Sequence, residues 1–138
     1  MRQIVCRAHA LRCLYAQKYT QDLDPTVLWD EFNEDEAPLS ARETSFVREL
    51  LDGVNSHIEQ VDLQIEAHAK GWSLERIPRV ERNVLRIAIY ELLYCADTPA
   101  GAIINEAVEL AKLYGDEHSA SYINGILGNI FRERTAAE

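Results

Sequence analysis

Apolar side chains recur every three or four residues along residues 47–68 of this chain. They follow one another in steps of four and three: Val47, Leu51, Val54, Ile58, Val61 and Ile65, with His68 next. A long face of this kind predicts an α-helix that packs against other helices. Ser40 and Glu43 have the spacing of a capping box at its start, and Gly71 is a typical end. We therefore expect one long helix between Ser40 and Gly71.

The segment RVERNVLRIAIYELLYC, residues 79–95, is apolar on nearly every side of the helix that it predicts. Such a helix is surrounded by other helices, so we expect it at the centre of the fold. Further helices are expected at 2–19, 25–32, 99–114 and 119–133, with a short turn at 74–77. Asp24, Ser73 and Thr98 are the predicted caps of the segments that they precede. The pattern predicts an all-α bundle of about seven helices in one domain, residues 1–138.

The charges of the chain are distributed unevenly. Residues 1–21 contain Arg2, Arg7, Arg12 and Lys18 and no acidic residue, although the whole chain has 14 basic and 23 acidic residues and a formal net charge of −9. A negative protein repels nucleic acid at long range, so binding it requires a local basic patch. Two interpretations stay open. Either these basic residues contact phosphates while tyrosines stack on bases, or they balance acidic groups on a neighbouring helix and the tyrosines border the core. The tyrosines concerned are Tyr15, Tyr19, Tyr114 and Tyr122.

No catalytic or metal-binding motif is evident. Cys6, His9 and Cys13 lie close to one helix face, but a fourth zinc ligand is lacking, and cysteine is commonly a small buried side chain. Glu106 and Glu109 do not form the Glu-x-x-His pattern of di-iron bundles. We therefore expect no catalytic residue, metal or cofactor. No apolar run reaches the ~20 residues of a membrane helix, and no secretory signal opens the chain, which predicts a cytoplasmic protein.

Several blocks of the sequence agree, in order and spacing, with one known family. The blocks are ALRCLYAQ (10–17), FVRELLDGV (46–54), GWSLERIPRVERNVLRIAIYELLY (71–94), INEAVELAKLYG (104–115) and YINGIL (122–127). They resemble the NusB family of bacterial transcription antitermination factors over about residues 7–131. The resemblance implies an all-helical fold of two small subdomains and no catalysis. It also implies binding of boxA-type single-stranded leader RNA of ribosomal RNA operons, together with NusE, a ribosomal protein, in an RNA polymerase antitermination complex.

The resemblance further implies two surfaces. One is an RNA surface on the first helix and on the turn before the last helix. The RNA-binding residues implied by position are Arg7, Tyr15, Tyr114, His118 and Tyr122, with Arg2 and Lys18 as supporting charges. The other is a surface for NusE on the central helix, where Glu81 pairs with a basic residue and Glu91 adds a second acidic contact.

The chain departs from the family pattern at two places. Gln3, Ile4 and Val5 stand where members with strong RNA binding carry arginines, so phosphate contacts are lost. His118 stands where an acidic residue can occur, which removes repulsion toward phosphate. The missing arginines keep a second function open: a protein–protein interaction module or homodimeric scaffold with weak or lost RNA binding.

A third hypothesis comes from a related domain. A NusB-like domain also precedes the catalytic domain of an rRNA cytosine methyltransferase, which needs S-adenosylmethionine and a nucleophilic cysteine. Because this sequence ends at Glu138, we expect no catalysis of that kind from it.

Overall fold

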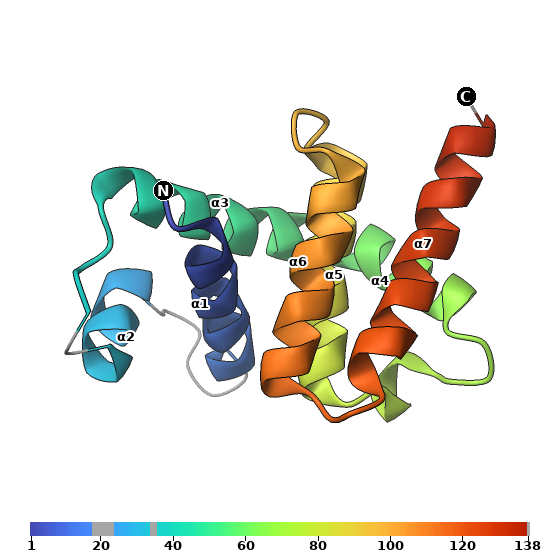
Figure 1. Cartoon of the computed structure of the whole chain (residues 1–138), viewed down its shortest axis with the longest axis horizontal. Helices are drawn as coiled ribbons and strands as arrows, with labels where there is room; N and C mark the ends of the chain where they lie inside the picture. Colours follow the sequence, from blue (N-terminus) through green and yellow to red (C-terminus); the bar gives the residue numbers. More distant parts are fainter. Residues whose placement is uncertain (18–23, 34–35, 138) are drawn as a thin grey trace.

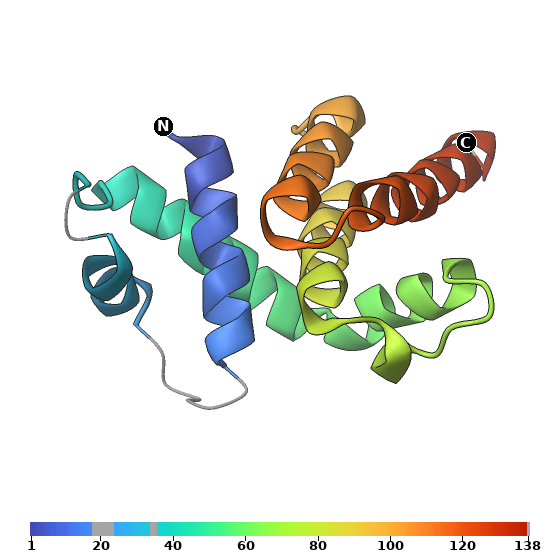
Figure 2. The ribbon, with the colours of Figure 1, turned by 60° about the horizontal axis from the view of Figure 1, so that its bottom comes forward.

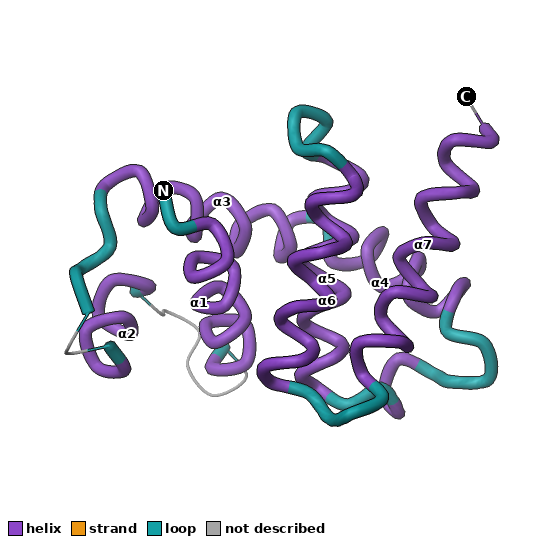
Figure 3. Tube along the Cα trace, in the orientation of Figure 1, coloured by secondary structure: helices purple, strands orange, loops and turns teal. Residues whose placement is uncertain are grey.

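The computed structural model describes residues 1–17, 24–33 and 36–137, so Lys18 and Tyr19 lie outside the described residues. Within these ranges the chain consists of α-helices, one short 3-10 turn and loops, and it has no strand (Figure 3). The helices are α1 (Gln3–Ala16), α2 (Pro25–Phe32), α3 (Ala41–Ser56), α4 (Ile58–His68), α5 (Arg79–Tyr94), α6 (Ala100–Tyr114) and α7 (Ser119–Ala137), with the 3-10 turn η1 at Leu74–Arg76. The all-α prediction is confirmed.

The helices form two groups, which are joined by the contacts of α5 with α1 and α3. α1, α2 and α3 pack together on one side, and α4 to α7 pack together on the other (Figure 1). α3 runs from the first group toward the second, and the turned view shows α1 lying across it (Figure 2). α1 and α6 both descend in Figure 1 and contact each other, so their carboxyl-terminal ends lie at the same edge of the molecule.

α5 is the central helix, as its sequence predicts. It contacts α1, α3, α4, α6 and α7. Val84, Leu85, Ile87 and Ile89 on its sides are buried, and the core extends from them to residues of every neighbouring helix. Among the described helices, none is long and apolar enough to cross a membrane.

The prediction of a single long helix between Ser40 and Gly71 is wrong, because the helix is interrupted at one residue. The structure ends α3 at Ser56 and begins α4 at Ile58, with His57 between them at φ −114° and ψ 22°. The His57 ring stacks on Tyr94 of α5 with 3.8 Å between ring centroids. The His57 amide still donates to the Gly53 carbonyl at 3.1 Å, so the break costs little backbone hydrogen bonding. The aromatic contact with α5 is the physical reason that we assign to the break.

Two of the predicted helix starts are confirmed, whereas three other predicted helix boundaries differ from the structure. The Ser40–Glu43 capping box is present with both hydrogen bonds, and Asp24 accepts from the Thr26 amide at 2.9 Å. α4 ends at His68, with Ala69 as its C-cap, and so stops before the predicted Gly71. Gly71 lies in the turn that follows, at φ +80°, a backbone conformation that favours glycine. Thr98 is not the cap of α6, because Pro99 occupies that position and its carbonyl accepts hydrogen bonds from the Ala102 and Ile103 amides. Ser73 precedes η1 without a capping hydrogen bond from its side chain.

Candidate nucleic-acid interface

Arg2 lies at the start of α1 and is engaged with the start of α3. Its Nε and Nη2 donate to the two carboxylate oxygens of Glu43, each at 2.9 Å, and its guanidinium lies 5.2 Å from the centre of the Trp29 ring. These hydrogen bonds hold the pKa of Glu43 well below its usual range. Arg2 remains about one third exposed, but its charge already has an internal partner.

Arg7 lies inside the fold, although the resemblance implies that it contacts RNA. Only 3% of its surface is exposed. Its Nε and Nη2 donate to Glu91 at 2.7 and 2.6 Å, and its Nη1 donates to Glu106 and, at 3.3 Å, to Gln3. The carboxylates come from α5 and α6, so a phosphate reaches this guanidinium only if the ion pairs open.

The contacts with Arg7 also occupy the carboxylate of Glu91. It is 2% exposed and its two oxygens are held by Arg7, so it does not present a carboxylate to a partner protein. For Arg2, Arg7 and Glu91 the structure therefore favours internal charge balance over external contacts. This was one of the two interpretations that the charge pattern left open.

Tyr15 and Tyr114 lie together at the carboxyl-terminal ends of α1 and α6. Both rings are nearly half exposed, at 44% and 46%, and both line a groove of about 160 Å³ with Arg12 and Val80. The Arg79 guanidinium lies 5.0 Å from the centre of the Tyr15 ring, within the range of a cation–π contact. Two aromatic rings with cationic side chains beside them are suited to stacking on unpaired bases. We name this site the tyrosine groove.

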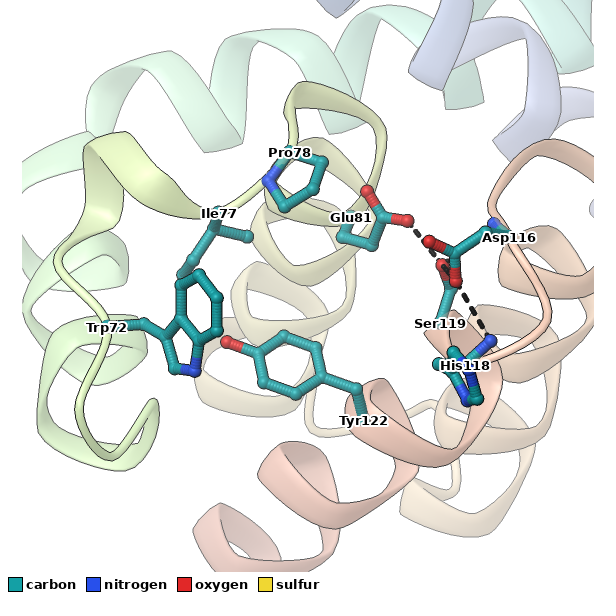
Figure 4. A pocket seen from close by; sticks show the side chains of 8 residues that line it. All are labelled: Trp72, Ile77, Pro78, Glu81, Asp116, His118, Ser119 and Tyr122. Atoms are coloured by element: carbon teal, nitrogen blue, oxygen red, sulfur yellow. Dashed lines mark hydrogen bonds between the residues drawn. The ribbon is translucent and has the colours of Figure 1, made fainter.

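A second pocket lies where the α6–α7 turn meets the start of α5 (Figure 4). It has a volume of about 190 Å³ and is lined by Trp72, Ile77, Pro78, Glu81, Asp116, His118, Ser119 and Tyr122. Glu81 is 6% exposed and accepts a hydrogen bond from the Ser119 hydroxyl. The turn itself is held by Asp116, whose carboxylate accepts from the His118 amide at 2.8 Å. We name this site the Trp72 pocket.

The Trp72 pocket brings together residues that the resemblance assigns to different ligands. Glu81 is assigned to NusE, whereas His118 and Tyr122 are assigned to RNA, yet all three line the same pocket. In Figure 4 the Tyr122 ring extends from α7 with its hydroxyl toward Trp72, while Glu81 lies on the side of Ser119 and Asp116. The Tyr122 hydroxyl is buried, and within the described part of the chain it has no hydrogen-bond partner; burial raises its pKa.

Sequence reasoning missed two residues of these sites. Trp72 is 53% exposed and follows Gly71, outside every apolar face; a large exposed aromatic after a helix end was the available signal. Arg79 directly follows Pro78 at the start of α5, and nothing in the local spacing indicates that it reaches Tyr15 of α1.

The three residues considered for zinc are buried side chains of α1. Burial raises the pKa of Cys13 to about 12 and that of Cys6 to about 11, whereas the thiolate is the form that binds metal. The His9 Nε2 lies 2.8 Å from the Pro25 carbonyl oxygen, which occupies that ring nitrogen. Among residues 1–17, 24–33 and 36–137, no group of three His, Cys, Asp or Glu side chains is arranged to hold a metal ion.

Comparisons with known proteins find similarity along most of the chain. A family model described as "NusB family" matches residues 5–132. The transcription antitermination protein NusB of Geobacter sp. (strain M21) is 40% identical over 130 residues, which cover 90% of this chain and 90% of that protein. The protein of the same name from Heliobacterium modesticaldum is 47% identical over 103 residues, which cover 75% of this chain and 50% of that protein.

A solved structure has a similar fold. A chain from the crystal structure of antitermination factors NusB and NusE in complex with dsRNA superimposes with a TM-score of 0.78 at 29% sequence identity. The superposition covers 96% of this chain and 99% of that chain.

Proposed function

This chain belongs to the NusB family, and we propose that it is a non-enzymatic transcription antitermination factor that binds boxA-type leader RNA of ribosomal RNA operons together with NusE. A relative of similar fold has been crystallised with NusE and dsRNA, which supports both partners. In this proposal residues 1–138 act as one RNA-binding domain. The protein works in the cytoplasm within the RNA polymerase antitermination complex.

The tyrosine groove supports the RNA part of the proposal. Tyr15 and Tyr114 offer exposed rings, and unpaired bases of RNA commonly stack on such rings. Arg12 and Arg79 bring positive charge to the same groove of an otherwise acidic protein. His118 extends the proposed RNA surface onto the turn before α7. The proposed surface does not include Arg7.

The observation that carries the proposal is the position of Glu81 in one pocket with His118 and Tyr122. A basic side chain of NusE that pairs with Glu81 brings its charge next to the residues proposed for RNA. NusE bound there enlarges the RNA-binding surface and offsets part of the repulsion from a protein of net charge −9. RNA and NusE are therefore expected to bind cooperatively.

Fluorescence anisotropy of a labelled boxA RNA tests this expectation. The RNA is titrated with the protein alone, with NusE alone and with an equimolar mixture, at two salt concentrations. We expect weak, salt-sensitive binding by the protein alone and an affinity for the mixture at least about tenfold higher, because a coupling of about 1.4 kcal/mol is in the usual range. A scrambled RNA of the same length is the control and is expected to bind more weakly. An unchanged affinity in the mixture contradicts the proposal.

A second candidate function is a homodimeric or protein–protein scaffold of the same fold. Ile4 and Val5 replace arginines of the family and line a pocket of about 170 Å³ with Leu113, which is 65% exposed. Ile4 and Val5 are half-buried, and together with the exposed Leu113 they form a partly exposed apolar surface, which favours protein contacts. Mass measurement in solution, combined with Tyr122→Ala, separates the two functions: the scaffold requires a stable dimer whose RNA binding is unaffected by that substitution.

A further inference from the structure

The contacts of Arg7 assign it a role that differs from the one implied by the resemblance. We propose that Arg7 is a positioning residue, which holds α1 against α5 and α6 through Glu91 and Glu106 and thereby sets the spacing of Tyr15 and Tyr114 in the tyrosine groove. In this role Arg7 does not contact RNA itself. The inference rests on the proposed function, because it concerns how the RNA surface is assembled.

The donors of the Arg7 guanidinium are already engaged. Nε and Nη2 bind Glu91 as a bidentate pair, Nη1 binds Glu106 and Gln3, and the Phe46 ring of α3 lies 5.1 Å from the guanidinium carbon. One side chain therefore contacts three other helices, α3, α5 and α6. A planar guanidinium is suited to this bridging, whereas a lysine ammonium is a point charge without the fork geometry.

The Arg7–Glu106 ion pair lies the same number of residues before the tyrosine groove on α1 and on α6. Tyr15 lies eight residues after Arg7 on α1, and Tyr114 lies eight residues after Glu106 on α6. Since α1 and α6 run in the same direction, each ring lies about 12 Å beyond the ion pair on its own helix. A change in the Arg7–Glu106 contact is thus expected to shift both rings relative to each other.

The charge of the cluster also argues against a direct phosphate contact. One guanidinium faces two carboxylates, so the group has a formal charge of −1. Such a group does not attract RNA. Opening it to reach a phosphate leaves Glu91 buried and unpaired, which is strongly unfavourable.

Glu91→Gln separates the two roles because they predict opposite changes. If Arg7 contacts phosphate, this substitution removes a competing carboxylate and RNA affinity rises. If Arg7 positions α1, the substitution weakens the bidentate pair, and we expect RNA affinity to fall by roughly tenfold, the size of one lost recognition contact. Glu109→Gln on α6 removes an equal charge from an exposed pair with Lys112 and is the matched control, expected to bind RNA at least as tightly as wild type.

Arg7→Gln and Arg7→Lys supply two further measurements with boxA RNA. If Arg7 is a positioning residue, both variants lose RNA affinity. In that case Arg7→Gln keeps the wild-type slope of the logarithm of the RNA binding constant against the logarithm of the salt concentration. For a phosphate contact, Arg7→Lys retains affinity, and Arg7→Gln lowers the slope by about 0.7. NusE affinity, which concerns the Trp72 pocket, is expected to stay at the wild-type value; a parallel loss of RNA and NusE binding indicates general unfolding and overturns the specific role.

Folding is checked for each variant by circular dichroism. If Arg7→Gln does not fold, the double variant Arg7→Met/Glu91→Met tests the role, because apolar side chains often replace a buried ion pair without loss of stability. Positioning predicts that the double variant folds and recovers part of the RNA affinity, because apolar packing restores the contact of α1 with α5 while the contact of Arg7 with Glu106 stays lost. A folded double variant without RNA binding overturns the inference. Failure of the wild-type protein to bind boxA RNA would count against the proposed function instead.

Discussion

Gly53 lies in α3 where that helix meets the ring of Tyr90 on α5. A Cβ atom added at Gly53 would overlap the Tyr90 ring. The ring has little room to move, because it is 8% exposed and lies beside the stacked His57 and Tyr94 rings, with centroids 6.1 and 5.7 Å away. The cost of glycine in a helix, up to about 1 kcal/mol relative to alanine, is therefore offset by this close approach of two helices.

Gly53→Ala is expected to lower the free energy of unfolding by about 1–3 kcal/mol, because overpacking of a tight contact outweighs the gain in helix propensity. Urea denaturation followed by circular dichroism measures the change. Gly125→Ala is the control, since a Cβ at that position inside α7 meets open space, and it is expected to raise stability by about 0.5–1 kcal/mol. Equal stabilities of the two variants would show that Tyr90 does not require the glycine.

At the scale of elements, Glu43 joins the starts of two helices. One carboxylate oxygen accepts from the Ser40 amide at 3.0 Å and from Arg2 Nη2 at 2.9 Å, and the other accepts from the Arg2 amide and Nε. The same side chain thus completes the capping box of α3 and fixes the first residues of α1. Its pKa is lowered mainly by the hydrogen bond from the Arg2 side chain.

This lowered pKa predicts a pH dependence of stability. Because the folded pKa lies below the unfolded value of about 4.3, the contribution of Glu43 is fully present above about pH 5 and is lost as the pH falls through the acid range. Glu43→Gln should therefore differ most from wild type near pH 7 and approach it toward pH 3. Urea midpoints at several pH values give this difference. Glu109→Gln, an exposed control, is expected to follow wild type throughout; a Glu43→Gln difference that does not change with pH contradicts the assignment.

At the scale of the whole molecule, the two helix groups are expected to unfold together. α1 and α3 of the first group both contact α5 of the second, and the buried Arg7–Glu91 pair crosses between them. Breaking one side of such a pair leaves a buried charge, so separation of the groups is unfavourable. The arrangement predicts one cooperative unit instead of two independent subdomains.

The two tryptophans report on different groups and allow a test. Trp29 is buried in α2, and Trp72 lies beside η1. In Trp72→Phe, fluorescence reports only on Trp29, while circular dichroism reports on all helices. We expect coincident thermal transitions from the two probes. A second circular dichroism transition, at a higher temperature than the Trp29 fluorescence transition, would indicate that the two helix groups unfold independently.

The sequence alone was sufficient for the features that depend on local spacing. The helical periodicity, the Ser40 capping box, the turn at Gly71 and the central position of residues 79–95 follow from side chains within a few turns of one another. The blocks that resemble the NusB family were equally accessible. Tyr15 and Tyr114 were named as candidates, although their meeting in one groove was not predicted.

Only the tertiary structure decided which charges are engaged inside the fold and where a helix breaks. Arg7 and Glu91 are 84 residues apart, and His57 meets Tyr94 on another helix. Periodicity indicates which face of a helix is buried, but not which residue of a distant helix lies opposite. A positive first helix in an acidic chain therefore could not reveal that two of its arginines balance carboxylates of α3, α5 and α6.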